Sequence, residues 1–125
     1  MRQSTEAVNR NRKYMREYMK ERRAQDTEFK ARQTKANRKY RARVREEVRE
    51  LLAEFRKNGC RACPEKDPAC LEAHHLRDKN FDLGVAGSMT ALRVQEELKK
   101  CICLCSNCHK KHHAGRLEIT SSLLG

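Results

Sequence analysis

Between Thr5 and Lys57 the sequence contains neither proline nor glycine, the two residues that most often interrupt a helix. The residues in this stretch are mainly Arg, Lys, Glu, Gln, Ala and Met, all of which favour helices or tolerate them well. We therefore predict one or two long helices. They should end at Asn58-Gly59, where Gly59 can adopt the left-handed conformation of a helix cap.

Long apolar runs are also missing. No stretch approaches the roughly 18 apolar residues of a membrane span, and no secretion signal precedes the basic N-terminus, so we expect an intracellular protein. Charged residues make up 37% of the chain, which leaves material for only a small hydrophobic core. A folded part of about 60 residues is marginal without a staple such as a bound zinc ion.

Negative charge is scarce in the N-terminal half. Residues 1–59 contain 19 Lys and Arg against nine Asp and Glu, a net +10 out of +12 for the whole chain. This imbalance is typical of a protein that binds a polyanion. Arg38, Arg41 and Arg45 fall close to one helix face and are candidate contacts for nucleic-acid phosphates. The alternative is a charged helix that is simply solvated.

Shorter elements are expected in the C-terminal half. Apolar residues at helical spacing in the last long helix should dock it on this half through Val44, Val48, Leu51, Leu52 and Phe55. Short strands are expected at residues 70–76 and 101–105, and helices at 88–98 and 108–114, with Gly115 ending the last helix. Residues 77–87 should form the loop that follows the first strand. The tail has apolar residues, and either packing on this domain or contact with a partner would account for them.

Seven cysteines in a chain with no secretion signal favour metal binding over disulfides. Four of them form two knuckles, Cys60-x-x-Cys63 and Cys105-x-x-Cys108, a thiolate set that suits a structural Zn²⁺. Ordinary burial is the alternative for these four. It is the preferred interpretation for the remaining three, Cys70, Cys101 and Cys103.

Histidines gather beside the knuckles. His109 and His113 are four residues apart, so on a helix they share one face and can chelate one divalent ion. His74 or His75 from a strand would complete a three-ligand site with open positions, as catalysis requires. Two alternatives remain: His109 or His112 could join the structural zinc, or the histidines could be solvated polar residues.

Taken together, Cys60-x2-Cys63, Leu71-Glu-Ala-His-His-Leu76 and Lys100-Cys-Ile-Cys-Leu-Cys105-Ser-Asn-Cys108-His109-x3-His113 resemble an HNH endonuclease of the His-Me finger (ββα-metal) superfamily. The similarity is closest to the zinc-knuckle members of phages and mobile elements, and it covers about Cys60 to Gly115. It implies DNA as the partner and a bacterial or phage-infected cytoplasm as the setting.

The resemblance implies a role for each matching position. His75 takes the place of the general base. His74, His109 and His113 would hold one catalytic divalent ion, which could be Mg²⁺, Mn²⁺, Ni²⁺ or Zn²⁺. The structural Zn²⁺ would be held by the four knuckle cysteines.

One position departs from the family pattern. The middle Asn of the motif should lie at position 100, where this chain has Lys100. We expect Lys100 to contact phosphate instead, together with Arg77, Lys110 and Lys111; solvated surface cations are the alternative for these.

These observations predict an α+β fold, with a small zinc-stapled ββα-metal (HNH) domain preceded by a long basic α-helical arm. The expected parts are a basic DNA-binding arm (1–58), a nuclease domain with structural zinc (59–116) and a C-terminal tail (117–125). The predicted function is metal-dependent cleavage of DNA phosphodiester bonds, as a nick or a double-strand cut. The alternative function is a non-catalytic, zinc-stabilised nucleic-acid-binding protein.

Overall fold

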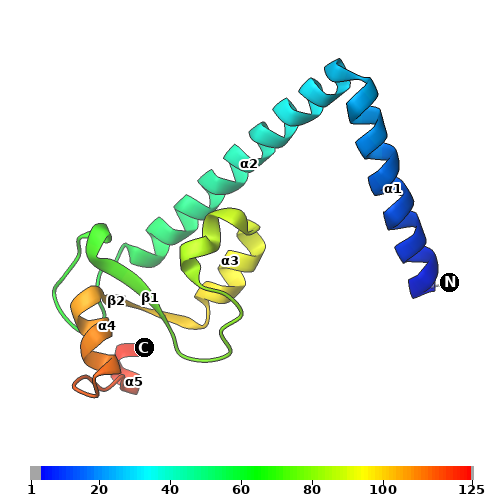
Figure 1. Cartoon of the computed structure of the whole chain (residues 1–125). Helices are drawn as coiled ribbons and strands as arrows, with labels where there is room; N and C mark the ends of the chain where they lie inside the picture. Colours follow the sequence, from blue (N-terminus) through cyan, green and yellow to red (C-terminus); the bar gives the residue numbers. More distant parts are fainter. Residues whose placement is uncertain (1–3, 125) are drawn as a thin grey trace. The chain divides into compact units, whose positions relative to one another are not determined.

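The computed structural model describes residues 4–124 and has an α+β fold, mostly helical with one two-stranded sheet, as predicted (Figure 1). Within this range no helix is both long and apolar enough to span a bilayer. The main elements are, in order, α1 (Thr5–Gln25), α2 (Thr27–Arg56), β1 (Leu71–His75), α3 (Ala91–Leu98), β2 (Cys101–Cys105), α4 (Ser106–His113) and α5 (Ser121–Leu124). Two 3-10 turns, η1 (Pro68–Cys70) and η2 (Leu83–Ser88), complete them.

The two long helices meet at Asp26, although no proline or glycine interrupts the sequence there. The Asp26 Oδ1 atom accepts a hydrogen bond from the Phe29 amide at 2.9 Å and so caps the start of α2. Two contacts bridge the break. The Arg22 guanidinium lies 4.0 Å from the centre of the Phe29 ring, and Arg23 Nε donates to Gln33 Oε1 at 2.6 Å.

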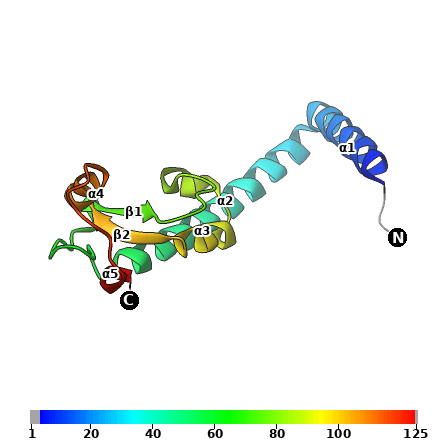
Figure 2. The same ribbon diagram turned by 90° about the horizontal axis from the view of Figure 1, so that it is seen from below.

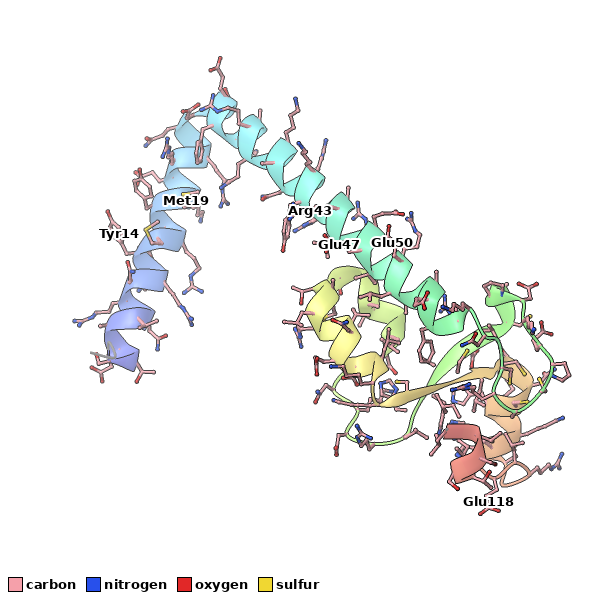
Figure 3. All side chains as sticks on the ribbon, turned by 180° about the vertical axis from the view of Figure 1, so that it is seen from behind. Tyr14, Met19, Arg43, Glu47, Glu50 and Glu118 are labelled. Carbon is pink, nitrogen blue, oxygen red and sulfur yellow. The ribbon has the colours of Figure 1, made fainter. Side chains whose placement is uncertain are left out.

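By its contacts the chain divides into two compact units, unit 1 (Met1–Arg41) and unit 2 (Ala42–Gly125). The division falls inside α2 rather than at Asn58-Gly59, because the apolar stripe at the end of α2 packs on the rest of unit 2. In unit 1, α1 buries no residue, and its side chains, Tyr14 and Met19 among them, project around the helix (Figure 3).

Unit 2 has two small apolar clusters, and the predicted stripe on α2 contributes to both. Phe55 packs on the cluster around the sheet and the knuckles, which also receives Leu117, Ile119 and Leu123 from the tail. The tail therefore packs on this unit. Val44, Val48, Leu51 and Leu52 pack on the second cluster, which includes Ala86 of η2 and Val94 of α3. The end of the predicted loop forms the 3-10 turn η2, which buries Ala86 in this cluster.

The antiparallel sheet pairs Leu71 with Cys105 and His75 with Cys101. Figure 2 shows β1 and β2 side by side, with α3 near one end of the pair and α4 near the other. Since side chains alternate along a strand, Glu72 and His74 lie on one face of β1 and His75 lies on the opposite face. This alternation decides which histidines can meet.

Two glycines end helices in the left-handed conformation, as predicted. Gly59 follows α2 with φ +75°, and Gly115 follows α4 with φ +73°. The backbone packs closely at Gly59, where an added Cβ atom would lie 2.6 Å from the carbonyl oxygen of Glu65. Glycine is therefore needed there for space as well as for φ, whereas at Gly115 the surroundings are open.

Candidate metal centres

The four knuckle cysteines converge from two distant segments of unit 2. Cys60 and Cys63 follow the Gly59 cap, while Cys105 ends β2 and Cys108 lies in the first turn of α4. Their sulfur atoms all lie within 4.8 Å of one another, and the Sγ atoms of Cys63 and Cys105 are 3.6 Å apart. Two sulfurs bound to one tetrahedral zinc would be about 3.8 Å apart. The cluster can hold a zinc ion.

Backbone amides donate hydrogen bonds to two of these sulfurs. The Cys60 sulfur accepts from the Ala62 amide at 3.4 Å, and the Cys105 sulfur accepts from the Cys108 amide at 3.3 Å. Burial would raise the pKa of Cys60, but hydrogen bonds from the backbone of Cys105 and of Ala62, and from Cys63, lower it to about 7. Burial raises the pKa of Cys108, and its contacts with the other thiols raise it further. A dication at the centre would offset the mutual repulsion of four thiolates.

The other three cysteines lie outside this cluster. Cys103 is buried in the core, as expected, and half-buried Cys101 directs its thiol to the carbonyl oxygen of Glu97 at 3.4 Å. The expectation that Cys70 is a core residue was wrong. Cys70 is exposed because it ends the η1 turn ahead of β1.

A second cluster joins His74 of β1 to His109 and His113 of α4. The ring nitrogens that could serve as ligands all lie within 4.8 Å of one another. The Nε2 atoms of His109 and His113 are 3.0 Å apart, as expected of residues one helical turn apart that face the same point. Two nitrogens bound to one ion at about 2.1 Å would be about 3.0 Å apart in octahedral coordination and about 3.4 Å apart in tetrahedral coordination. This set can therefore hold a divalent ion separate from the cysteine cluster.

Glu72 orients one of these rings. Its Oε2 atom lies 2.6 Å from His109 Nδ1, and its Oε1 atom accepts from the Ser106 hydroxyl at 3.0 Å. These hydrogen bonds, the one from His109 first, lower the pKa of Glu72. Because the ionised carboxylate can only accept, it holds the proton on His109 Nδ1, and in the neutral ring the Nε2 lone pair is left for a metal.

His74 is kept neutral by its surroundings. Burial, followed by repulsion from His109, His112 and His113, lowers its pKa to about 4. A neutral imidazole is the state that binds metal. His112 lies beside His74, with ring centroids 4.7 Å apart, but its Nδ1 donates to the Leu117 carbonyl at 2.8 Å and holds the tail. The structure thus places His112 outside both metal sets.

His75 borders the same cavity as the histidine cluster but makes a different contact. Its Nε2 atom lies 2.9 Å from Oε1 of Glu97, a residue of α3 that is only 1% exposed. The cavity has a volume of about 770 Å³ and is lined by residues from α2, β1, the following loop and α4. His74, His75, His109 and His113 are all among them.

The predicted phosphate contacts have different surroundings. Arg77 is exposed and lines the cavity, as does Lys79, which sequence analysis did not single out. Lys100 instead has two intramolecular partners, the Asp78 carbonyl oxygen at 2.9 Å and Glu97 Oε2 at 3.1 Å. Exposed positions are occupied by the remaining predicted contacts, Arg38, Arg41, Arg45, Lys110 and Lys111. Binding of phosphate by any of these residues stays a prediction.

Glu72 and Glu97 were not predicted as site residues from the sequence. Glu72 had a signal, since it precedes His74 by two residues on a predicted strand and therefore shares its face. Glu97 had none, because only the packing of α3 on the sheet brings it to His75. A third missed feature is a repeated tetrapeptide, Asn11-Arg-Lys-Tyr14 in α1 and Asn37-Arg-Lys-Tyr40 in α2. Tyr14 and Tyr40 are 63% and 53% exposed, which marks both copies as surface features.

No protein-family model, curated protein or solved structure matches this chain. The cysteine and histidine clusters, each of which could hold a metal ion, and the cavity beside His75 are therefore the observations that bear on function.

Proposed function

We propose that unit 2 is a divalent-metal-dependent endonuclease of the HNH type and that unit 1 holds it on DNA. One observation carries the proposal. Three imidazole nitrogens from β1 and α4 converge within 4.8 Å, apart from the cysteine set, beside a cavity that a fourth histidine also lines. A metal site with few protein ligands and an adjacent base is the layout of hydrolytic catalysis.

The reaction proposed is hydrolysis of a phosphodiester. His75 accepts a proton from a water molecule, whose oxygen attacks phosphorus as the bond to the 3′ oxygen breaks. The departing 3′ oxygen takes a proton from solvent and His75 returns its proton to solvent, so the products are a 5′-phosphate and a 3′-hydroxyl. A divalent ion held by His74, His109 and His113 would stabilise the charge on the phosphate and on the departing oxygen. Arg77 borders the same cavity and supplies positive charge for phosphate, whereas Lys79, also at the cavity, is paired with Asp82.

The composition of the ligand set bears on which ion is used. Three imidazoles suit borderline ions such as Zn²⁺, Ni²⁺ or Co²⁺ better than the hard ion Mg²⁺, which prefers oxygen ligands. Mn²⁺ discriminates less between imidazole nitrogen and oxygen ligands. We therefore expect Ni²⁺, Mn²⁺ or Zn²⁺ to support cleavage better than Mg²⁺.

A cleavage assay on supercoiled plasmid tests the proposal. The zinc-loaded chain is supplied with each divalent ion in turn, and nicked and linear products are measured. His109→Ala removes a metal ligand and His75→Ala removes the base, so both are expected to abolish most activity. His112→Asn is the matched control, because Asn can still donate to the Leu117 carbonyl. Equal activity of all four proteins, or none in the parent chain with any ion, would contradict the proposal.

A second function, nucleic-acid binding without catalysis, is favoured by the charge of the arm alone. The +10 of residues 1–59 would attract a polyanion whether or not the histidine cluster binds metal. The same assay separates the two functions. Under the second one, plasmid is retarded in a gel at low salt but remains supercoiled with every ion.

A further inference from the structure

Glu97 is the one buried charged residue among those the structure describes, and its environment is built around its carboxylate. The side chain is 2% exposed and both oxygens are used. Oε1 accepts from the Asn80 amide at 2.9 Å and lies 2.9 Å from His75 Nε2, while Oε2 accepts from Lys100 Nζ at 3.1 Å. A buried carboxylate is costly unless it is paired and hydrogen-bonded, and this one meets both conditions.

These contacts join three segments that are separate in the sequence. Glu97 is the last but one residue of α3, His75 ends β1, and Asn80 lies in the loop that follows β1. The Lys100 ammonium closes the arrangement, because it also donates to the Asp78 carbonyl oxygen in that loop. The loop and the end of β1 are thereby fixed to α3 next to the cavity.

The direction of the hydrogen bonds determines where the proton on His75 lies. Burial would raise the pKa of Glu97, but the hydrogen bonds from Asn80, Lys100 and His75 lower it to about 2. The carboxylate is ionised at neutral pH and can only accept. Nε2 of His75 must therefore carry the hydrogen. In the neutral ring the lone pair is then on Nδ1.

We infer that Glu97, held in place by Lys100, is the positioning residue for His75: it accepts the Nε2–H and so leaves Nδ1 as the proton acceptor beside the cavity. This inference rests on the proposed function insofar as it concerns catalysis. It also gives Lys100 a role, since its two bonds fix both the carboxylate and the loop that carries the Asn80 amide. A ring without this contact would populate both tautomers and turn about its side-chain bonds.

The neighbouring residue on α3 offers a matched control. Glu96 pairs with Lys99 at the same i,i+3 spacing, at 2.8 Å, but its side chain is 59% exposed. Glu97→Met removes the acceptor at nearly constant volume, and Glu96→Met makes the same chemical change outside the network. Glu97→Gln retains one oxygen, which the Asn80 amide keeps oriented toward His75.

The first measurement is the tautomer of His75, read from long-range ¹H–¹⁵N correlations of the ring in zinc-loaded protein at a pH where the ring is neutral. We expect the Nε2–H form in the parent chain, in Glu96→Met and in Glu97→Gln, and a mixture in Glu97→Met. An Nδ1–H form in the parent chain would overturn the inference without any variant, so the test holds even if Glu97→Met fails to fold.

The second measurement is steady-state cleavage by the same four proteins. Loss of the oriented base is expected to lower kcat of Glu97→Met by roughly 10²-fold or more, with KM changed by no more than about twofold and zinc content unchanged. Glu97→Gln should recover a large part of kcat. Equal losses in Glu96→Met and Glu97→Met, or a change confined to KM, would contradict the positioning role.

Together, the two measurements distinguish failure of the inference on Glu97 from failure of the proposed function. If the parent chain cleaves DNA but His75 is not the Nε2–H tautomer, the inference on Glu97 is wrong and the proposed function stands. If the parent chain cleaves nothing while the tautomer follows Glu97 as described, the proposed function is wrong and the structural part of the inference stands.

Discussion

Glu72 and His109 meet across the interface between β1 and α4, with 2.6 Å between Oε2 and Nδ1. The carboxylate lies two residues from His74 on the same strand face, so one short strand supplies both a candidate ligand and the group that orients another. This relationship makes the histidine cluster a pre-oriented site and suggests a first test of it.

Glu72→Gln is expected to weaken binding of a divalent ion at the histidine cluster by roughly 10- to 100-fold, because His109 loses a charged partner that fixes its tautomer and raises its basicity. Titration of zinc-loaded protein with Ni²⁺ or Co²⁺, followed by calorimetry, measures the change. Glu118→Gln is the control, since Glu118 is an exposed tail residue (Figure 3). Unchanged affinity in Glu72→Gln would remove this carboxylate from the site.

Replacing a knuckle cysteine should remove zinc and unfold unit 2. Structural zinc contributes on the order of 10 kcal/mol in small domains, more than two small apolar clusters can replace. Cys105→Ser is expected to abolish stoichiometric zinc and cooperative thermal unfolding. Cys70→Ser should retain both, since Cys70 is exposed and outside the cluster. Metal analysis together with calorimetry checks the pair, and a folded, zinc-free Cys105→Ser protein would contradict the prediction.

The two helix-ending glycines are expected to differ in their tolerance of alanine. Gly115→Ala should cost about 1–2 kcal/mol of unfolding free energy, the usual penalty of a left-handed residue with a Cβ atom. Gly59→Ala should cost about 1–3 kcal/mol more, because its Cβ atom would lie 2.6 Å from a backbone oxygen. Denaturant unfolding of zinc-loaded protein gives both values. Equal costs would mean that the backbone at Gly59 relaxes freely.

The repeated tetrapeptide predicts equivalent contributions of Arg12 and Arg38 to nucleic-acid binding. If each contacts a phosphate, Arg12→Gln and Arg38→Gln should each reduce the slope of log K against log salt by about 0.9, and the double variant by about twice that. Fluorescence anisotropy with labelled duplex over a salt series measures the slopes. Lys99→Gln is the control, since Lys99 is an exposed cation that directly follows α3. Slopes equal to that of the parent chain would exclude these contacts.

Stability should depend on pH through Glu97. The pKa of this group falls from 4.5 to about 2 on folding, so its contribution is fully present above about pH 4.5 and is lost as pH falls through about 2. The stability difference between the parent chain and Glu97→Gln should therefore be constant near neutrality and shrink in acid. The comparison is made over the pH range in which metal analysis shows that both proteins keep their zinc, because loss of zinc is expected to unfold unit 2. A stability difference that grows in acid would mean that folding raises the pKa of Glu97 instead of lowering it.

Much of the secondary structure could be predicted from local patterns. The absence of helix breakers predicted the long helices, alternation predicted β2, and glycine predicted both helix ends, because propensity and capping depend on neighbouring residues. The break at Asp26 was missed. An aspartate that caps a new helix competes with helix continuation, and nothing in the composition around it shows which one prevails.

The pairing of ligands was predictable only where spacing decides it. His109 and His113 share a helix face through their i,i+4 spacing, and each pair of knuckle cysteines lies within one turn. The addition of His74 to the first pair required the antiparallel register of β1 with β2. The first knuckle is held against β2 by a contact outside that register, in which the Arg61 amide donates to the Cys103 carbonyl oxygen at 3.0 Å. That register depends on burial of residues distant in the sequence.

By itself, then, the sequence determined the helices, the strands, the basic character of the first 59 residues and the residue types able to bind metal. These follow from composition, periodicity and short spacings. Tertiary structure alone decided that His74 faces α4 while His75 contacts Glu97, that Lys100 bonds inside the protein, and that Cys70 is exposed. The reason is physical: a contact between distant segments forms only when the folded core repays the entropy of bringing them together.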